Sequence, residues 1–197
     1  MSNIILDKFD RNKNSKGTVP IWLMRQAGRY LPEYKKIRSN NKDFINFCLN
    51  IKDSSEVTLQ PLERFNLDAA IIFSDILLIN YAAGQDVKFK ENFGPVLQKL
   101  DNEAFLAIKK DDFINKLSNC YKSIRNVRNL LHKDKTLIGF AGSPWTLLVY
   151  ALNLKSPKNE FVLNCKEDVI LKLLNKFVNL ISSFMFIPGA SCRPFWT

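Results

Sequence analysis

The sequence has few of the residues that most often bind metal ions. It contains one histidine, His132, and its four cysteines are scattered without a C-x-x-C pair: Cys48, Cys120, Cys165 and Cys192. This spacing argues against a zinc site and indicates reduced thiols. His132 lies near the end of a predicted helix, where a charge at the helix C-terminus is a better interpretation than catalysis or metal binding.

Long hydrophobic runs are also missing. No apolar run reaches the ~18 residues expected of a membrane-spanning helix. Residues 1–8 carry an early acid and no long apolar stretch, so they do not resemble a secretory signal. At 197 residues and 46% hydrophobic, the chain is too apolar for a disordered protein and long enough to bury a substantial core. We therefore expect a cytoplasmic protein with no membrane partner.

The charge balance is strongly basic, with a formal net charge of +10. Such a protein can bind nucleic acid, an anionic membrane surface or an acidic small molecule. Most of the excess is lysine spread among asparagines and isoleucines, which indicates compositional bias. No base-reading helix, RNA-stacking motif or zinc finger is present, so we predict no nucleic-acid partner. A non-catalytic basic protein, with weak and salt-sensitive binding to nucleic acid, remains an alternative.

The informative positive charges lie in residues 22–38, WLMRQAGRYLPEYKKIR. Arg25 and Arg29 are four residues apart, so a helix would place them on one face, where like charges repel. Arginine can bind a carboxylate through two parallel hydrogen bonds, and several arginines together, with Arg38, could hold a polycarboxylate. A solvated basic face is the alternative. The aromatic and aliphatic residues between the arginines argue against it.

The order of predicted elements is typical of an α/β fold with parallel strands. Apolar segments 67–75 and 136–141 predict two buried strands. Asp75 falls at the carboxyl end of the first strand, where active-site residues gather in barrels of alternating strands and helices. Residues 84–98 alternate in polarity and predict a hairpin that turns at 91–92.

Capping residues and apolar periodicity predict the helices. Asp43 caps a short helix, Ser54 begins a helix distorted by Pro61, and Ser143 caps a helix that starts at Pro144. In the second of these, Val57, Leu59, Leu62 and Phe65 form the apolar face. Two longer amphipathic helices are predicted over residues 112–131 and 167–184.

Three ordered blocks resemble one known family: PIWLMRQAGRYLPE at 20–33, LQPLERFNLDAAIIFSDIL at 59–77 and LIGFAGSPWTLLVY at 137–150. They resemble uroporphyrinogen decarboxylase, the haem-pathway family that removes the four acetate carboxyl groups of uroporphyrinogen III to give coproporphyrinogen III. The similarity runs from about residue 20 to 185. The family's TIM barrel needs eight strands, so the resemblance implies an incomplete TIM (β/α)8 barrel with an N-terminal arginine-rich segment.

The resemblance also implies a lyase mechanism that needs no cofactor. Protonation of a pyrrole carbon creates an electron sink, and a buried carboxylate stabilises the resulting cation. By resemblance Asp75 is that carboxylate, and Arg29 or Arg25 is a candidate to supply or order the proton. The residues expected to bind substrate are Arg25, Gln26, Ala27, Arg29, Arg38, Asp75 and Tyr150. Without the resemblance, a helix cap is an almost equally good interpretation of Asp75, and Tyr150 would be interpreted as an aromatic residue of the core.

We expect three segments: an irregular lead-in at 1–19, the barrel-like part at 20–185, and an aberrant tail at 186–197. The change in composition after Met185 suggests a shifted reading frame and a truncated chain. The family's later serine-containing strand end and C-terminal histidine have no counterpart, which leaves a non-catalytic remnant as an alternative. A corrinoid-linked methyltransferase is disfavoured because its zinc ligands are missing. A homodimer is expected if the chain is intact.

Overall fold

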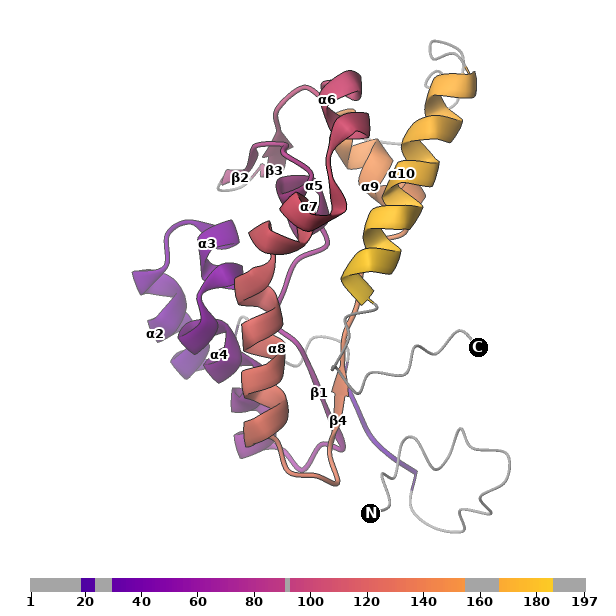
Figure 1. Cartoon of the computed structure of the whole chain (residues 1–197). Coiled ribbons are helices and arrows are strands. Elements are labelled where there is room, and N and C mark those ends of the chain that lie inside the picture. Colours follow the sequence, from indigo (N-terminus) through magenta and orange to yellow (C-terminus); the bar gives the residue numbers. More distant parts are fainter. Residues whose placement is uncertain (1–18, 24–29, 91–92, 155–166, 186–197) are drawn as a thin grey trace, which may run out of the picture. The chain divides into compact units, whose positions relative to one another are not determined.

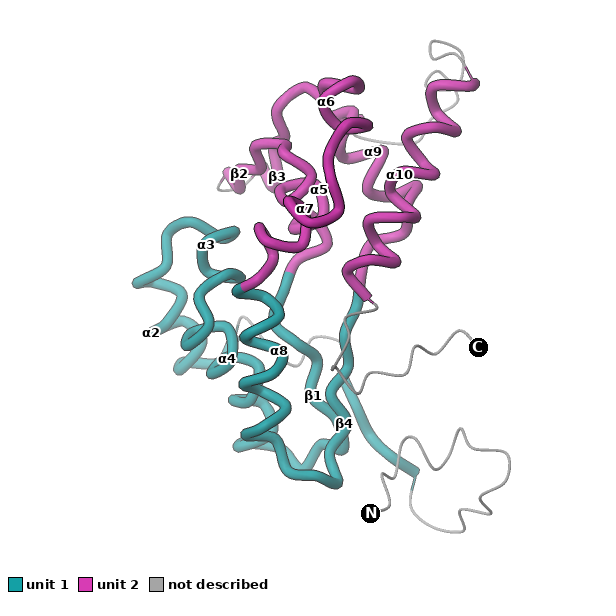
Figure 2. The backbone as a smooth tube through the Cα atoms, in the orientation of Figure 1, with its two compact units in different colours: residues 1–74, 119–140 teal, residues 75–118, 141–197 magenta. Residues whose placement is uncertain are grey.

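The structure, a computed structural model, describes residues 19–23, 30–90, 93–154 and 167–185 (Figure 1). These residues divide into two compact units (Figure 2). Unit 1 contains residues up to 74 and residues 119–140, and unit 2 contains residues 75–118 and those from 141 onward. Each unit combines helices with a two-stranded sheet, which confirms the α/β class. The predicted lead-in, apart from Val19, and the predicted tail lie outside the described residues.

The sheet of unit 1 is the predicted parallel pair. Strand β1 (Ala69–Ile71) pairs in register with β4 (Thr136–Ile138), from Ala69 opposite Thr136 to Ile71 opposite Ile138. Both strands are shorter than predicted. The expectation that β4 is buried was wrong, because Leu137 and Ile138 stay partly exposed. Helix α4 packs on β1, and β1 is the only strand beside β4 in the part of the chain described.

The helices of unit 1, as far as its residues are described, are α2 (Pro32–Asn40), α3 (Phe44–Leu49), α4 (Ile51–Arg64) and α8 (Ser118–Leu130). The predicted cap of α3 is confirmed, since the Asp43 side chain accepts the N–H of Asn46 at 2.7 Å. The predicted start of α4 was wrong. The Asn50 side chain accepts the N–H of Asp53 at 3.1 Å and caps the helix four residues before Ser54.

The buried face of α4 also differs from the prediction. It consists mainly of small polar side chains, with Ser54, Ser55 and Thr58 at most 2% exposed, while Phe65 is 43% exposed. Val57 of the predicted apolar face is fully buried, but apolar periodicity missed the hydroxyl positions, because hydroxyl groups can be buried when they form hydrogen bonds. The apolar core of unit 1 combines aliphatic side chains with a cluster of aromatic rings. Phe47 and Phe73 lie 4.6 Å apart between ring centroids, with Tyr34 and Phe44 packed around them.

The elements of unit 2 are α5 (Leu78–Ala82), β2 (Val87–Lys90), β3 (Gly94–Leu97), α6 (Asn102–Ala107), α7 (Lys110–Lys116), α9 (Pro144–Ala151) and α10 (Glu167–Met185). Strands β2 and β3 form the predicted antiparallel hairpin. Ser143 caps α9 as predicted and accepts the N–H of Thr146 at 3.2 Å. Helix α10 ends one residue past its prediction and packs on α9, α7 and α6.

The helix predicted over residues 112–131 is two helices, α7 and α8. The interruption falls at Leu117, whose N–H bonds to Ile114 three residues back at 3.1 Å, as in a tightened last turn. Phe113, Leu117 and Val127 are fully buried, so the apolar positions were identified correctly. An unbroken 3.6-residue period did not reveal the interruption at Leu117. In the described part of the chain, no helix has both the length and the apolarity to cross a membrane.

Candidate active site

Asp75 lies just past the carboxyl end of β1, as predicted. Its half-buried carboxylate accepts the N–H of Leu77 through Oδ1 at 2.8 Å, and its carbonyl accepts the N–H of Leu78 at 3.2 Å. These bonds close the turn that leads into α5. Asp75 does not cap α5, whose N-cap residue is Leu77 and has no side-chain cap hydrogen bond, but its carboxylate is bound by the turn before the helix. Its catalytic role stays a prediction.

Tyr150, the other predicted site residue of unit 2, lies on α9 and is partly buried. Helices α5 and α9 pack against each other, so the elements that follow Asp75 and carry Tyr150 are neighbours. Gly142 permits this packing, since a Cβ there would lie 2.8 Å from Cδ2 of Leu147 and 3.1 Å from Cβ of Ile76. The GSPW turn thus needs glycine for close approach.

Two buried amide side chains join α5, α9 and the hairpin, and we call Asn80 and Gln85 the amide clasp. Asn80 Nδ2 donates to the carbonyl of Leu147 at 3.2 Å and to Gln85 Oε1 at 3.1 Å. Gln85 Nε2 donates to the carbonyls of Ala151 at 2.8 Å and Gln98 at 2.7 Å. Sequence reasoning missed the amide clasp. The available signal was a lone amide, Asn80, inside the apolar run ILLINYA.

The arginine-rich motif is described only at its flanks, because Arg25, Gln26, Ala27 and Arg29 lie outside the described residues. On the upstream side, the N–H of Ile21 donates to Asp68 Oδ2 at 2.7 Å, and the N–H of Asp68 donates to the carbonyl of Ile21 at 2.9 Å. On the downstream side, Arg64 Nη2 donates to Glu33 Oε2 at 2.9 Å. The hydrogen bond from Arg64 lowers the pKa of Glu33. The upstream flank is thus bound to the connection between α4 and β1, and the downstream flank to the last residue of α4.

Arg38, the third predicted arginine, belongs to unit 1 and contacts the end of its own helix. Its guanidinium donates to the carbonyls of Asn41 and Lys42, the latter at 3.2 Å. The guanidinium carbon lies 5.6 Å from the ring centroid of Phe44 and 6.0 Å from that of Phe47. These contacts cap α2 and add cation–π attraction. A substrate-binding role for Arg38 stays a prediction.

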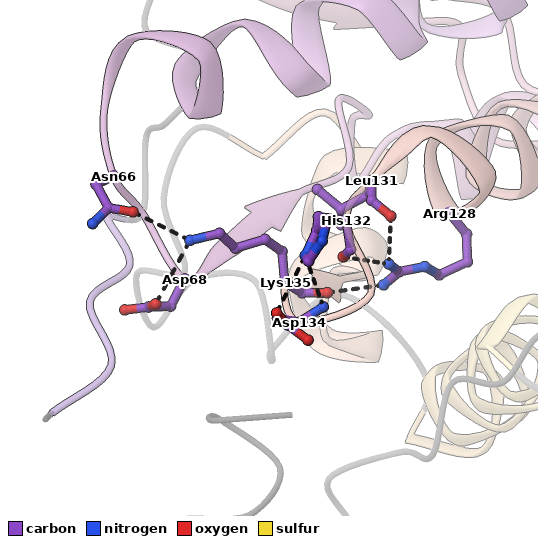
Figure 3. A network of polar contacts seen from close by, with 7 residues as sticks. All are labelled: Asn66, Asp68, Arg128, Leu131, His132, Asp134 and Lys135. Atoms are coloured by element: carbon purple, nitrogen blue, oxygen red, sulfur yellow. Dashed lines mark hydrogen bonds and ion pairs between the residues drawn. The ribbon is translucent and has the colours of Figure 1, made fainter. Parts of the chain in front are cut away.

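Polar contacts also hold the opposite, amino-terminal ends of β1 and β4 (Figure 3). Lys135 Nζ lies 3.8 Å from Asp68 Oδ1 and donates to Asn66 Oδ1 at 3.3 Å. Arg128 donates to the carbonyls of Leu131, His132 and Lys135 at 2.9–3.0 Å. The His132 ring is exposed, and its Nδ1 lies 3.4 Å from Asp134 Oδ2. The contacts at this end of the sheet stabilise the fold, whereas active-site residues of such folds gather at the other end, which Asp75 follows.

A buried thiol contacts the residue before Asp75. Cys120 on α8 is 2% exposed and forms a side-chain hydrogen bond with Ser74. Burial raises the pKa of the Cys120 thiol to about 11, and the bond to Ser74 opposes this shift. Cys48 is also buried and reduced, which agrees with the prediction of free thiols for the cysteines that are described.

Because the pKa of Cys120 is raised, we expect the free energy of unfolding to fall at alkaline pH. Because the folded protein holds this proton up to about pH 11, while an exposed thiol releases it near 9.0, stability is complete below pH 9 and declines as the pH rises toward 11. A shift of this size corresponds to about 2–3 kcal/mol. Urea unfolding at pH 8 and pH 11 should show the decline in the wild type and a smaller one in Cys120→Ala. Equal declines in the two proteins would contradict the prediction.

Among the residues that the structure describes, no group of three or more histidine, cysteine, aspartate or glutamate side chains is arranged to hold a metal ion.

Comparisons with known proteins place the chain in a family. A family model described as uroporphyrinogen decarboxylase (URO-D) matches residues 9–185. The uroporphyrinogen decarboxylase of Rickettsia canadensis is 47% identical over 164 residues, which cover 83% of this chain and 48% of the relative. That of Rickettsia felis is 45% identical over 172 residues, covering 87% and 49% respectively. The chain thus spans about half the length of the curated relatives it matches.

A solved structure supports the fold alone. A methyltransferase from Methanosarcina mazei superimposes with a TM-score of 0.57 at 14% identity, over 74% of this chain and 44% of that protein. The α/β arrangement is thus shared with a protein of very different sequence. The sequence blocks around Arg25, Asp75 and Tyr150 resemble the same family that the family model matches. The chain therefore belongs to the uroporphyrinogen decarboxylase family.

Proposed function

We propose that this chain takes part in the decarboxylation of uroporphyrinogen, with Asp75 as the carboxylate that stabilises the cationic pyrrole. Family membership and the position of Asp75 support this proposal. A half-buried carboxylate at the carboxyl end of a parallel strand, held by the Leu77 N–H, can face developing positive charge without reorganising. We also propose that residues 20–185 form the N-terminal part of a TIM barrel.

Each decarboxylation consumes one proton and releases one carbon dioxide. Protonation of a pyrrole carbon makes the ring electron-poor. The bond between the acetate methylene and its carboxylate then breaks, and its electron pair moves into the ring. A proton added to the methylene carbon gives the methyl group, and loss of the first proton restores the pyrrole. Arg25, Arg29 and Arg38 are proposed to bind the remaining carboxylates, Gln26 and Ala27 to contact the substrate, and Tyr150 to hydrogen-bond it.

The proposal is tested by measuring carbon dioxide release from uroporphyrinogen III by the purified chain. We expect release by the wild type and a loss of about 100-fold or more in Asp75→Asn, since removing one preorganised charge costs about that much. Equal rates in the two proteins, or no release by folded wild type, would contradict an active Asp75 site. Homodimerisation and a cytoplasmic location stay predictions.

A binding measurement separates this proposal from a non-catalytic basic protein. Arg29→Gln and Arg125→Gln each remove one positive charge, but Arg125 is an exposed residue of α8 outside the motif. We expect Arg29→Gln to weaken uroporphyrinogen binding about tenfold, since a charge-assisted hydrogen bond contributes about 1.5–3 kcal/mol. Arg125→Gln should bind as the wild type does. Equal weakening by both, together with salt-sensitive nucleic-acid binding, would favour the basic binding protein.

A further inference from the structure

We propose that Thr58 is a positioning residue, which fixes the end of β1 and thereby the turn that carries Asp75. The inference rests on the proposed function only in its claim about catalysis. Its structural part concerns the backbone between Phe73 and Leu77 and can be tested separately.

The direct contact is between helix α4 and the backbone that follows β1. The Phe73 N–H donates to Thr58 Oγ1 at 2.9 Å, and both residues are buried. One residue earlier, the Ile72 N–H donates to the carbonyl of Ile138 at 3.0 Å and continues the pairing with β4. Successive N–H groups of a strand point to opposite edges, so the Phe73 N–H points away from β4. The Thr58 side chain therefore accepts the N–H that follows β1 on the edge opposite β4.

Thr58 is held in turn by further hydrogen bonds, and we call Thr58, Ser54 and Ser123 the hydroxyl chain. Thr58 Oγ1 donates to the carbonyl of Ser54 at 2.7 Å. Ser54 Oγ donates to Ser123 Oγ on α8 at 2.8 Å, and Ser123 Oγ donates to the carbonyl of Asn119 at 3.1 Å. All three side chains are at most 1% exposed. A buried network in which each hydroxyl donates is rigid and specifies one arrangement.

A second contact holds the next residue. Ser74 bonds to the Cys120 thiol on α8, so α4 binds the backbone at residue 73 and α8 binds the side chain at residue 74. Ser54 and Ser123 tie these two helices together, although they lie 69 residues apart in the chain. The residue that follows this doubly held segment is Asp75, whose Oδ1 bonds to the Leu77 N–H. Because a peptide bond joins Ser74 to Asp75, we infer that the contacts of Phe73 and Ser74 fix the point from which this turn starts.

The hydroxyl of Thr58, rather than its volume, is the required feature. Valine has nearly the same shape and would fill the same space, but it cannot accept the Phe73 N–H. Serine lacks the methyl group and can still accept it. Thr58→Val should therefore release the turn, and Thr58→Ser should keep it.

The structural arm measures amide hydrogen exchange in Thr58→Val, Thr58→Ser and the control Ser55→Ala. Ser55 is also a buried hydroxyl of α4, but its Oγ donates to the Ile51 carbonyl at 2.6 Å. We expect exchange at the Phe73 and Leu77 amides to rise about tenfold in Thr58→Val alone, the size of one net hydrogen bond. Unchanged exchange at both amides, or an equal rise throughout the chain, would overturn the inference.

The catalytic arm measures uroporphyrinogen decarboxylation by the same proteins. We expect kcat to fall about tenfold in Thr58→Val with KM unchanged, because Asp75 acts on the reacting ring rather than on binding. Thr58→Ser should keep the kcat of the wild type, because it keeps the hydroxyl group. An active wild type whose Thr58→Val variant shows faster local exchange but unchanged kcat would overturn the positioning role. A wild type that neither binds nor decarboxylates substrate, with the local exchange effect present, would reject the proposed function and uphold the structural part of the inference.

Discussion

Replacing Phe47 by alanine is expected to lower the free energy of unfolding by about 3–5 kcal/mol. Phe47 is 0% exposed, and its ring lies 4.6 Å from that of Phe73 and 6.1 Å from that of Tyr34. The guanidinium of Arg38 also lies against it, at 6.0 Å. Removing the ring loses the transfer free energy of a buried aromatic group and leaves a cavity that the α3 backbone cannot close. Urea unfolding followed by circular dichroism measures the change.

Phe65 supplies the matched control for this experiment. It belongs to the same unit but is 43% exposed, at the C-terminal cap of α4. Phe65→Ala should cost less than about 1 kcal/mol, because a residue that stays largely in water loses little burial. Similar losses in Phe47→Ala and Phe65→Ala would mean that the aromatic cluster is not the core of unit 1.

Replacing Gln85 by methionine is expected to lower the free energy of unfolding by about 3 kcal/mol. Methionine has a similar length but donates no hydrogen bond, so the carbonyls of Ala151 and Gln98 lose their donor and Asn80 Nδ2 loses one acceptor. Each buried polar group left without a partner costs about 1–3 kcal/mol. Thermal and urea unfolding both measure this loss.

Gln98→Met is the control for Gln85→Met. The Gln98 side chain is exposed, while its backbone carbonyl still accepts the Gln85 side chain in the variant. We expect a change within about 0.5 kcal/mol, as for most surface substitutions. If Gln85→Met were as mild as Gln98→Met, the amide clasp would contribute nothing to the packing of α5, α9 and the hairpin.

Local patterns predicted the elements whose signals are local. The Asp43 and Ser143 caps, the hairpin around 91–92 and the two parallel strands were all recognised from neighbouring residues. The start of α4 was missed because Asn50 is as good a cap as Ser54, and serine at the latter position is instead buried by its bond to Ser123. The break at Leu117 was missed because its buried side chain fits an unbroken helix equally well.

The candidate site likewise has one part that the sequence predicted and one that it did not. The position of Asp75 after a strand could be predicted, because strand length and apolar pattern place it there. The partners that hold this turn could not, since Thr58, Ser123 and Cys120 come from helices far away in sequence and carry no motif. The roles of Arg25 and Arg29 came from resemblance to a family. Long-range pairing of small polar groups leaves little trace in a single sequence.

The pairing of β1 with β4 has a consequence for the order in which the chain folds during synthesis. Unit 1 is built from residues up to 74 and from residues 119–140, so β1 leaves the ribosome well before its partner. The hairpin of β2 and β3 pairs residues that are close in sequence and can form in the meantime. Until α8 and β4 emerge, Ser54 lacks Ser123 and the β4-facing edge of β1 stays unpaired. The nascent chain therefore exposes this strand edge at least until residues 136–138 have been translated, and it needs protection from wrong pairing throughout this period.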